Sequence, residues 1–181
     1  MEDRQACLSS FFPTDRQDCL SSTPLGVPIG ADTFATRRHL PHFAKAGRTL
    51  FVTFSTIGRS ELSPEARTIA FDCCLHDHEL THWLDTLVVM PDHVHMLFTL
   101  FDDWSLAASM RRVKGNSARR INLATASRGR VWQDESFDRT LRSSEDVRMK
   151  GEYVAANPVR AGFVARPEDY PWLWQQWRTQ K

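Results

Sequence analysis

The sequence predicts an α+β domain of the ferredoxin-like (RRM-like) class, an antiparallel sheet covered by helices, with one helix added at the C-terminal end. Three observations support this prediction. The 181 residues are enough for about one domain. Apolar β-branched and aromatic stretches alternate with stretches of helical periodicity. These stretches follow the order strand, helix, strand, strand, helix, strand, helix.

The first half of the domain contains two predicted strands around a helix. Residues 49–55 (TLFVTFS) are β-branched and aromatic, which is typical of a buried strand. A helix is expected to begin at Ser63, a favourable N-cap that precedes Pro64, and to end within residues 75–78. Residues 83–90 (WLDTLVVM) predict the next strand.

The second half continues this order. After a tight Pro-Asp turn, residues 93–101 (HVHMLFTLF) predict a strand that forms a hairpin with the previous one. Apolar residues at near-helical spacing predict a helix over residues 105–122. Residues 130–133 are expected to begin a short strand or a loop. A serine at position 143 or 144 caps a last helix, which the Asn-Pro pair at 157–158 ends.

The N-terminal region differs in composition from the rest of the chain. Residues 1–36 are rich in Ser, Pro, Gly and Asp and contain a near-repeat, at 3–10 and again at 15–22. Two copies are too few to build a repeat fold. We therefore expect residues 1–36 to be a poorly ordered extension and residues 37–181 to be the functional domain.

Composition also restricts the class of protein. The net charge of +1 argues against a uniformly basic DNA coat. No apolar run approaches the roughly 20 residues of a membrane span. The four cysteines fit neither a disulfide framework nor a paired Cys-x-x-Cys zinc site, so a reduced, cytoplasmic location is expected.

Two histidines stand at the start of the strand predicted at 93–101. Residues two apart on a strand face the same way, so His93 and His95 project side by side while Val94 points to the opposite face. Two imidazoles on one strand face can converge on one cation. The alternative is a pair of exposed histidines on a half-buried strand.

The chain has two tyrosines, and they have different surroundings in the sequence. Asn157 follows Tyr153 by four residues, so their side chains are expected to stack on one helical face, where the amide oxygen could hold a cation beside the tyrosine oxygen. The alternatives are a partly buried helix tyrosine and, for Asn157, a helix C-cap. Tyr170 has Trp174 at the same offset, which offers no ligand, and is interpreted as a packing residue.

Basic residues are concentrated between residues 104 and 130, where there are seven of them and no acidic residue. They are Arg111, Arg112, Lys114, Arg119, Arg120, Arg128 and Arg130. Such a run predicts a local phosphate-binding surface, and a solvated helix face is the alternative. Trp132 could stack on an unpaired base, or it could be a core tryptophan.

Several sequence blocks together resemble the single-tyrosine HUH transposases of the IS200-like superfamily, and among them the REP-associated tyrosine transposases. The first block is VVMPDHVHML, which contains the His-hydrophobic-His motif at His93-Val94-His95. The others are MRRVKGNSARRIN at 110–122, VWQDESFDR at 131–139, YVAANPVRAGFV at 153–164 and EDYPW at 168–172. The resemblance begins near Arg37, and residues 1–36 lie outside it.

The resemblance implies a metal-dependent single-stranded DNA endonuclease and strand transferase that acts at REP-type hairpins through a 5′-phosphotyrosine intermediate. It implies that Tyr153, on a catalytic C-terminal helix, is the nucleophile. His93, His95 and Asn157 would bind Mg²⁺ or Mn²⁺. We expect a monomer or homodimer without an obligate protein partner or a membrane. The expected DNA-binding residues are Arg111, Arg112, Lys114, Arg119, Arg120 and Trp132.

Three other interpretations remain. The first is a domesticated DNA- or RNA-binding protein on the same fold that no longer cleaves. The second is a metal phosphodiesterase that uses water, with Tyr153 in a structural role. The third is a zinc site drawn from Cys73, Cys74, His76, His78 and His82, against which the adjacency of the two cysteines argues.

Overall fold

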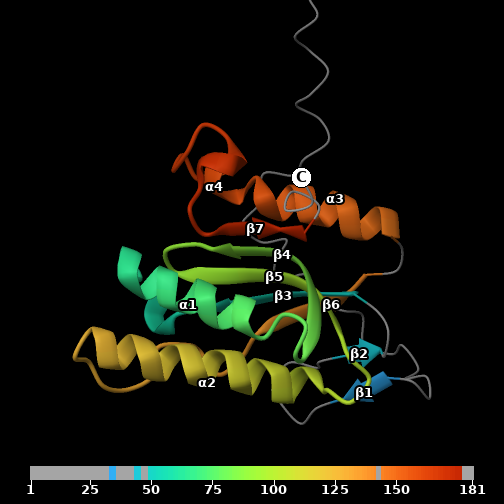
Figure 1. Ribbon diagram of the computed structural model, residues 1–181, viewed down its shortest axis with the longest axis horizontal. Helices are drawn as coiled ribbons and strands as arrows, with labels where there is room; N and C mark the ends of the chain where they lie inside the picture. The colour runs from blue at the N-terminus through green and yellow to red at the C-terminus, as the bar shows by residue number, and fades with distance from the viewer. Residues whose placement is uncertain (1–32, 36–42, 46–48, 142–143, 177–181) are drawn as a thin grey trace, which may run out of the picture.

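The computed structural model describes residues 33–35, 43–45, 49–141 and 144–176 (Figure 1). Its centre is a five-stranded antiparallel sheet in the order β6-β3-β5-β4-β7. The strands are β3 (Thr49–Ser55), β4 (His82–Val89), β5 (His93–Leu100), β6 (Phe137–Thr140) and β7 (Leu173–Gln175). A separate two-stranded pair consists of β1 (Thr33–Ala35) and β2 (Phe43–Lys45).

The helices complete a ferredoxin-like fold, as the sequence predicts. They are α1 (Pro64–His76), α2 (Leu106–Ala124), α3 (Ser144–Ala155) and α4 (Asn157–Arg160), with short 3-10 turns η1 (Ile57–Arg59) and η2 (Pro167–Asp169). From β3 to β6 the order is strand, helix, strand, strand, helix, strand, with β3 and β5 in the middle of the sheet. The added elements are α3, α4 and β7, which lies beside β4.

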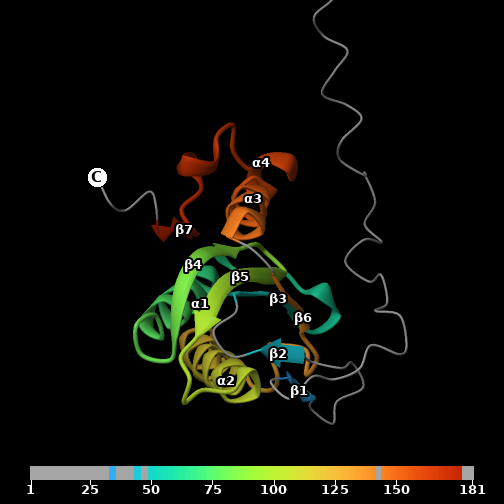
Figure 2. The ribbon, with the colours of Figure 1, turned by 90° about the vertical axis from the view of Figure 1, so that its right-hand side faces the viewer.

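Helices cover both faces of the sheet. Figures 1 and 2 show α1 and α2 on one face and α3 with α4 on the other. Val94, Met96 and Phe98 of β5 belong to the apolar core under α1 and α2, whereas Leu97 belongs to a second core that includes Val154 of α3. The period of two along β5 therefore sends alternate side chains into two different cores.

Local signals in the sequence explain where the helices begin and end. Ser63 Oγ accepts a hydrogen bond from the Ala66 amide at 3.2 Å, as expected for the cap of α1. Ser105 caps α2 in the same way. At the end of α3, Pro158 has no amide hydrogen to donate to the Val154 carbonyl, so the helix breaks at Ala156 and continues as the short α4.

Two sequence-based expectations need correction. The strand at the β3 edge of the sheet is β6, at residues 137–140, and not residues 130–133, which contribute only an isolated bridge between Trp132 and Thr56. Residues 33–35, which fall within the extension expected to be poorly ordered, form β1 and pair with β2. The predicted extension over residues 1–36 lies outside the described residues except for β1.

None of the helices in the described part of the chain is long and apolar enough to cross a lipid bilayer.

Candidate active site

The two histidines of β5 lie on the sheet face that α3 covers. Their Nε2 atoms are 3.1 Å apart, and their rings meet edge to face. His93 Nδ1 donates to the Asp92 carboxylate at 2.5 Å, and His95 Nδ1 is hydrogen-bonded to Thr53 Oγ1 at 2.8 Å. Each ring is therefore held from its Nδ1 side, which directs the two Nε2 atoms at each other.

Burial favours the neutral form of both imidazoles. His95 is 7% exposed, and burial lowers its pKa well below the ordinary histidine value. The neighbouring His93 and the cations of Lys150, Arg160 and Arg59 lower it further. Burial also lowers the pKa of His93, although Asp92 acts in the opposite direction. Neutral imidazole is the form of histidine that binds a metal ion.

The histidine pair fits a divalent cation. A carboxylate can only accept, so the bond to Asp92 leaves a lone pair on His93 Nε2, directed at His95. Two neighbouring ligands at about 2.1 Å from an octahedral ion lie about 3.0 Å apart, close to the observed 3.1 Å. The bonds to Asp92 and Thr53 are the kind of outer contact that orients metal-bound histidines.

A complete ligand set does not come from ionisable side chains. Within the described residues there is no group of three or more His, Cys, Asp or Glu that could hold an ion. The further ligand would therefore be an amide, a substrate oxygen or water. The same finding contradicts the alternative of a zinc site around Cys73, since all five of its residues lie in the described part of the chain.

Tyr153 lies on α3, on the same side of the sheet as the histidines. Its side chain is exposed (42%). Lys150 Nζ stands 4.6 Å from the centre of the Tyr153 ring and 4.1 Å from the centre of the Phe51 ring. Phe51 in turn stacks on His95, with ring centres 5.6 Å apart. A continuous set of contacts thus links the tyrosine to the histidine pair.

Asn157 is linked to Tyr153 through Arg160. The Arg160 guanidinium lies 4.0 Å from the centre of the Tyr153 ring and donates to the Tyr153 carbonyl oxygen at 3.1 Å. It also donates to Asn157 Oδ1. The amide oxygen that would act as a metal ligand is therefore bonded to a cation in this conformation, and Asn157 is the first residue of α4 rather than a cap of α3.

Tyr170 is a packing residue, as predicted. It is 4% exposed, and its hydroxyl donates to the Val89 carbonyl oxygen at 2.9 Å.

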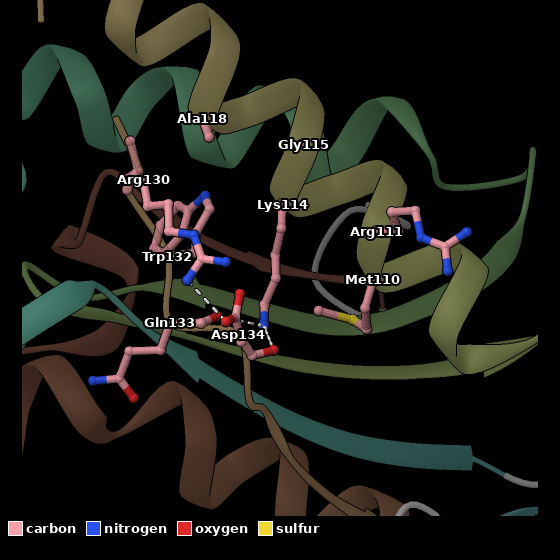
Figure 3. A pocket seen from close by; sticks show the side chains of 10 residues that line it. Met110, Arg111, Lys114, Gly115, Ala118, Arg130, Trp132, Gln133 and Asp134 are labelled. Atoms are coloured by element: carbon pink, nitrogen blue, oxygen red, sulfur yellow. Dashed lines mark hydrogen bonds and ion pairs between the residues drawn. The ribbon is translucent and has the colours of Figure 1, made fainter. Parts of the chain in front are cut away.

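The basic run lies on the opposite face of the sheet from the histidines and Tyr153, because α2 carries most of it (Figure 1). Arg112 Nε donates to the Asp77 carboxylate at 2.8 Å, and that carboxylate is 2% exposed. Lys114 Nζ donates to the carbonyl oxygens of Gln133 and Asp134 at 3.0 and 3.2 Å, beside a hollow of about 260 Å³ (Figure 3). These two predicted DNA contacts thus have partners within the protein.

Other members of the run are also engaged in the fold. Arg120 donates to the Cys73 sulfur at 3.5 Å, and Arg130 pairs with Asp134 at 2.8 Å. Trp132 is 5% exposed and donates to Ser117 Oγ, so the interpretation as a core tryptophan is correct and its ring is not available to a base. Phosphate binding by Arg111 and Arg119, both exposed on α2, stays a prediction.

The sequence reasoning missed the cations that do lie beside the candidate site. Lys150 precedes Tyr153 by three residues, which is a helical spacing that could have indicated it. Arg160 is separated from Tyr153 by the helix break, and Arg59 belongs to η1. Thr53 is opposite His95 only because of the β3–β5 register, which no local pattern reveals.

Residues 60–157 match the family model described as "Transposase IS200 like", and this range contains His93, His95, Tyr153 and Asn157. The chain belongs to the IS200-like transposase family. The REP-associated tyrosine transposase of Escherichia coli K12 is 28% identical over 94 residues, which are 51% of this chain and 52% of that protein. A Haemophilus influenzae protein that provisionally bears the same name is 24% identical over 96 residues, 48% of this chain and 54% of its own.

This IS200-like chain spans about half the length of the curated relatives it matches. A solved structure described as a REP-associated tyrosine transposase bound to a REP hairpin superimposes with a TM-score of 0.62 at 22% identity, over 75% of this chain and 81% of the other. The superposition confirms the predicted fold: an α+β arrangement with an antiparallel sheet.

Proposed function

We propose that this IS200-like protein is a transposase-type nuclease that cuts and rejoins single-stranded DNA at REP-type hairpins, with Tyr153 as the nucleophile. One observation carries the proposal: Tyr153 and the His93–His95 pair share one sheet face and are joined through Lys150 and Phe51. Membership of the family supports the reaction class. The hairpin bound to the solved relative supports the choice of substrate.

The reaction is an exchange of one phosphodiester for another. The Tyr153 oxygen forms a bond to phosphorus, and the bond from phosphorus to the 3′ oxygen breaks. The phenol loses its proton and the departing 3′ oxygen gains one, which leaves a 5′-phosphotyrosine and a free 3′-hydroxyl. A 3′-hydroxyl of another strand can reverse the step, because the energy of the phosphodiester is retained in the covalent link.

The residues of the site have separate tasks in this step. His93, His95 and Asn157 would hold Mg²⁺ or Mn²⁺, which supplies charge stabilisation at the phosphate oxygens. Asp92 and Thr53 hold the two rings in position. Tyr153 is exposed, so a strand can approach its oxygen without opening the core.

The test is a cleavage assay on a single-stranded REP-type hairpin with a label at either end. With Mg²⁺ or Mn²⁺, we expect a covalent protein–DNA adduct that carries the label from the 3′ side of the cut, because Tyr153 keeps the 5′ phosphate. Tyr153→Phe should abolish cleavage and adduct together, and its melting temperature should match the parent, since the lost hydroxyl belongs to an exposed side chain. His95→Ala should also stop cleavage.

Other outcomes point to the other interpretations. Cleavage by Tyr153→Phe at the parental rate, with no adduct, would support a phosphodiesterase that uses water. Tight hairpin binding by the wild-type protein without any cleavage in either metal would support the domesticated binding protein. An adduct that carries the label of the upstream fragment would contradict the 5′-phosphotyrosine.

A further inference from the structure

Three cationic side chains from three different elements surround the candidate site. Arg59 belongs to η1, Lys150 to α3 and Arg160 to α4. We call these three residues the cation triad. No run of basic residues links them in the sequence, because they are separated by 91 and 10 positions (150 − 59 and 160 − 150).

Arg59 lies at the His93 end of the site. Its Nη1 atom is 3.3 Å from Asp92 Oδ2, and the other oxygen of that carboxylate accepts from His93. The same guanidinium donates to Ser55 Oγ at 3.0 Å. The Arg59 side chain remains 58% exposed, so its remaining donors face solvent beside the histidines.

Lys150 and Arg160 lie at the Tyr153 end. Both charges stand over the Tyr153 ring, the ammonium at 4.6 Å and the guanidinium at 4.0 Å from its centre. Arg160 already donates to two neutral oxygens, the Tyr153 carbonyl and the Asn157 amide. Phosphate oxygens are stronger acceptors than either, and the planar guanidinium matches them in pairs.

Two acidic side chains near this surface already have cationic partners. Asp92 pairs with Arg59 but is shared with His93, and Glu152 of α3 pairs with Arg148 at 3.2 Å. Contacts join the three cations to the histidine pair: Arg59 through the shared Asp92 carboxylate, and Lys150 through the Phe51 ring that stacks on His95. Arg160 lies over the same Tyr153 ring as Lys150, so the three cations lie around one cluster.

We propose that the cation triad is a phosphate-binding site, and that single-stranded DNA enters the His93–His95–Tyr153 cluster across the α3 side of the sheet rather than along the basic run of α2. The inference rests on the proposed function for the choice of ligand. Arg59 and the Lys150–Arg160 pair lie at opposite ends of the cluster. A phosphate held by these cations would lie beside the cluster, on the α3 side of the sheet.

The basic residues of α2 are less suited to guide a DNA strand to Tyr153. Arg112 and Lys114 of the basic run are bonded to Asp77 and to main-chain carbonyls, and the whole helix lies across the sheet from Tyr153. A strand that followed α2 would not reach the tyrosine without passing around the sheet. The densest run of basic residues in the sequence therefore lies on the α2 side of the sheet, whereas the cations beside Tyr153 lie on the α3 side.

The test measures binding without cleavage. All proteins carry Tyr153→Phe, the buffer contains EDTA, and the probe is a short unstructured single-stranded DNA with a fluorescent end label, followed by anisotropy over a salt series. Arg59→Gln, Lys150→Gln and Arg160→Gln should each reduce the slope of log affinity against log salt by about 0.7, and affinity near 0.1 M salt by about fivefold. Arg160→Lys keeps the charge and should retain the slope.

Two comparison variants complete the design. Arg166→Gln is the matched control, because this exposed arginine is already paired with Asp169 at 2.8 Å, and its slope should equal the parent's. Arg119→Gln reports on α2 and should change the slope less than the triad variants do. Melting temperatures show which variants are folded. If Arg160→Gln does not fold, the salt slopes of Arg59→Gln and Lys150→Gln test the proposal.

The proposal would be overturned if the folded triad variants kept the parent's slope of log affinity against log salt. It would also be overturned if only Arg119→Gln reduced that slope. Its failure can be told apart from failure of the proposed function. The binding experiment does not require cleavage, and the adduct experiment with the wild-type protein does not depend on which surface binds the flanking phosphates.

Discussion

Replacement of Arg112 by alanine should destabilise the protein. In the structure, Arg112 Nε bonds the Asp77 carboxylate at 2.8 Å, and Asp77 is 2% exposed at the end of α1. The second carboxylate oxygen has no hydrogen-bond partner among the described residues. Removal of the guanidinium therefore leaves a buried negative charge whose remaining side-chain partner among the described residues is the exposed His76, at 3.3 Å.

The size of the effect follows from the burial of the pair. Loss of one partner from a fully buried ion pair costs about 3–5 kcal/mol. Arg112 is 39% exposed, so water can replace part of the lost interaction, and we expect about 2–3 kcal/mol. For a chain of this length, that corresponds to a fall in melting temperature of roughly 5–10 °C.

Thermal unfolding followed by circular dichroism measures this effect. Arg119→Ala is the control, because Arg119 is exposed on the same helix, and its melting temperature should be unchanged. The double variant Arg112→Ala/Asp77→Asn should recover much of the loss, since it removes the stranded charge. If Arg112→Ala melts with the parent and instead binds DNA more weakly, then Arg112 is a surface contact to DNA and does not stabilise the fold.

Two further predictions concern buried groups. Tyr170→Phe removes the hydrogen bond to the Val89 carbonyl and should cost about 1 kcal/mol, a fall of roughly 2–4 °C in melting temperature, with adduct formation retained; loss of the adduct would contradict its role as a packing residue. Burial raises the pKa of Asp85 to about 6, so the folded protein holds a proton that the unfolded chain releases near its ordinary value of 3.8. The free energy of unfolding should therefore decrease as the pH rises through roughly 4 to 6. Asp85→Asn should remove this decrease and add about 1–2 kcal/mol at pH 7, a figure reduced because the carboxyl group is only half-buried. Denaturant titrations at several pH values measure this effect. The prediction would be contradicted if the free energy of unfolding of the parent and of Asp85→Asn followed the same curve against pH.

The sequence predicts the fold well where its signals are local. The caps Ser63 and Ser105 mark the starts of α1 and α2, and the alternation along β5 assigns His93 and His95 to one face. Only four and three residues long, β6 and β7 stand at the two edges of the sheet and have mixed polarity, so they carry too little periodicity to be recognised.

The surroundings of the site depend on contacts between distant segments. Thr53 lies 42 positions from His95 and supports it only through strand register. The basic run stands out by its density, but the count of charges does not reveal that Arg112 and Lys114 are bonded within the protein. Arg160 does not stand out in the sequence, because a helix break separates it from Tyr153, whereas Lys150 lies one helical turn before Tyr153 on the same helix.

The packing of α3 has a consequence for how damaged copies behave in a mixture. Val154 of this helix is buried in a core with residues of its own chain's sheet, and the neighbouring Tyr153 is linked to His95 of the same chain through Lys150 and Phe51. Under the proposed function, each chain would then hold its own nucleophile and its own histidine pair. We therefore expect no complementation between a chain that lacks the tyrosine and a chain that lacks a histidine. In a mixture with the parent, an inactivating substitution should reduce activity only in proportion to the fraction of inactive chains.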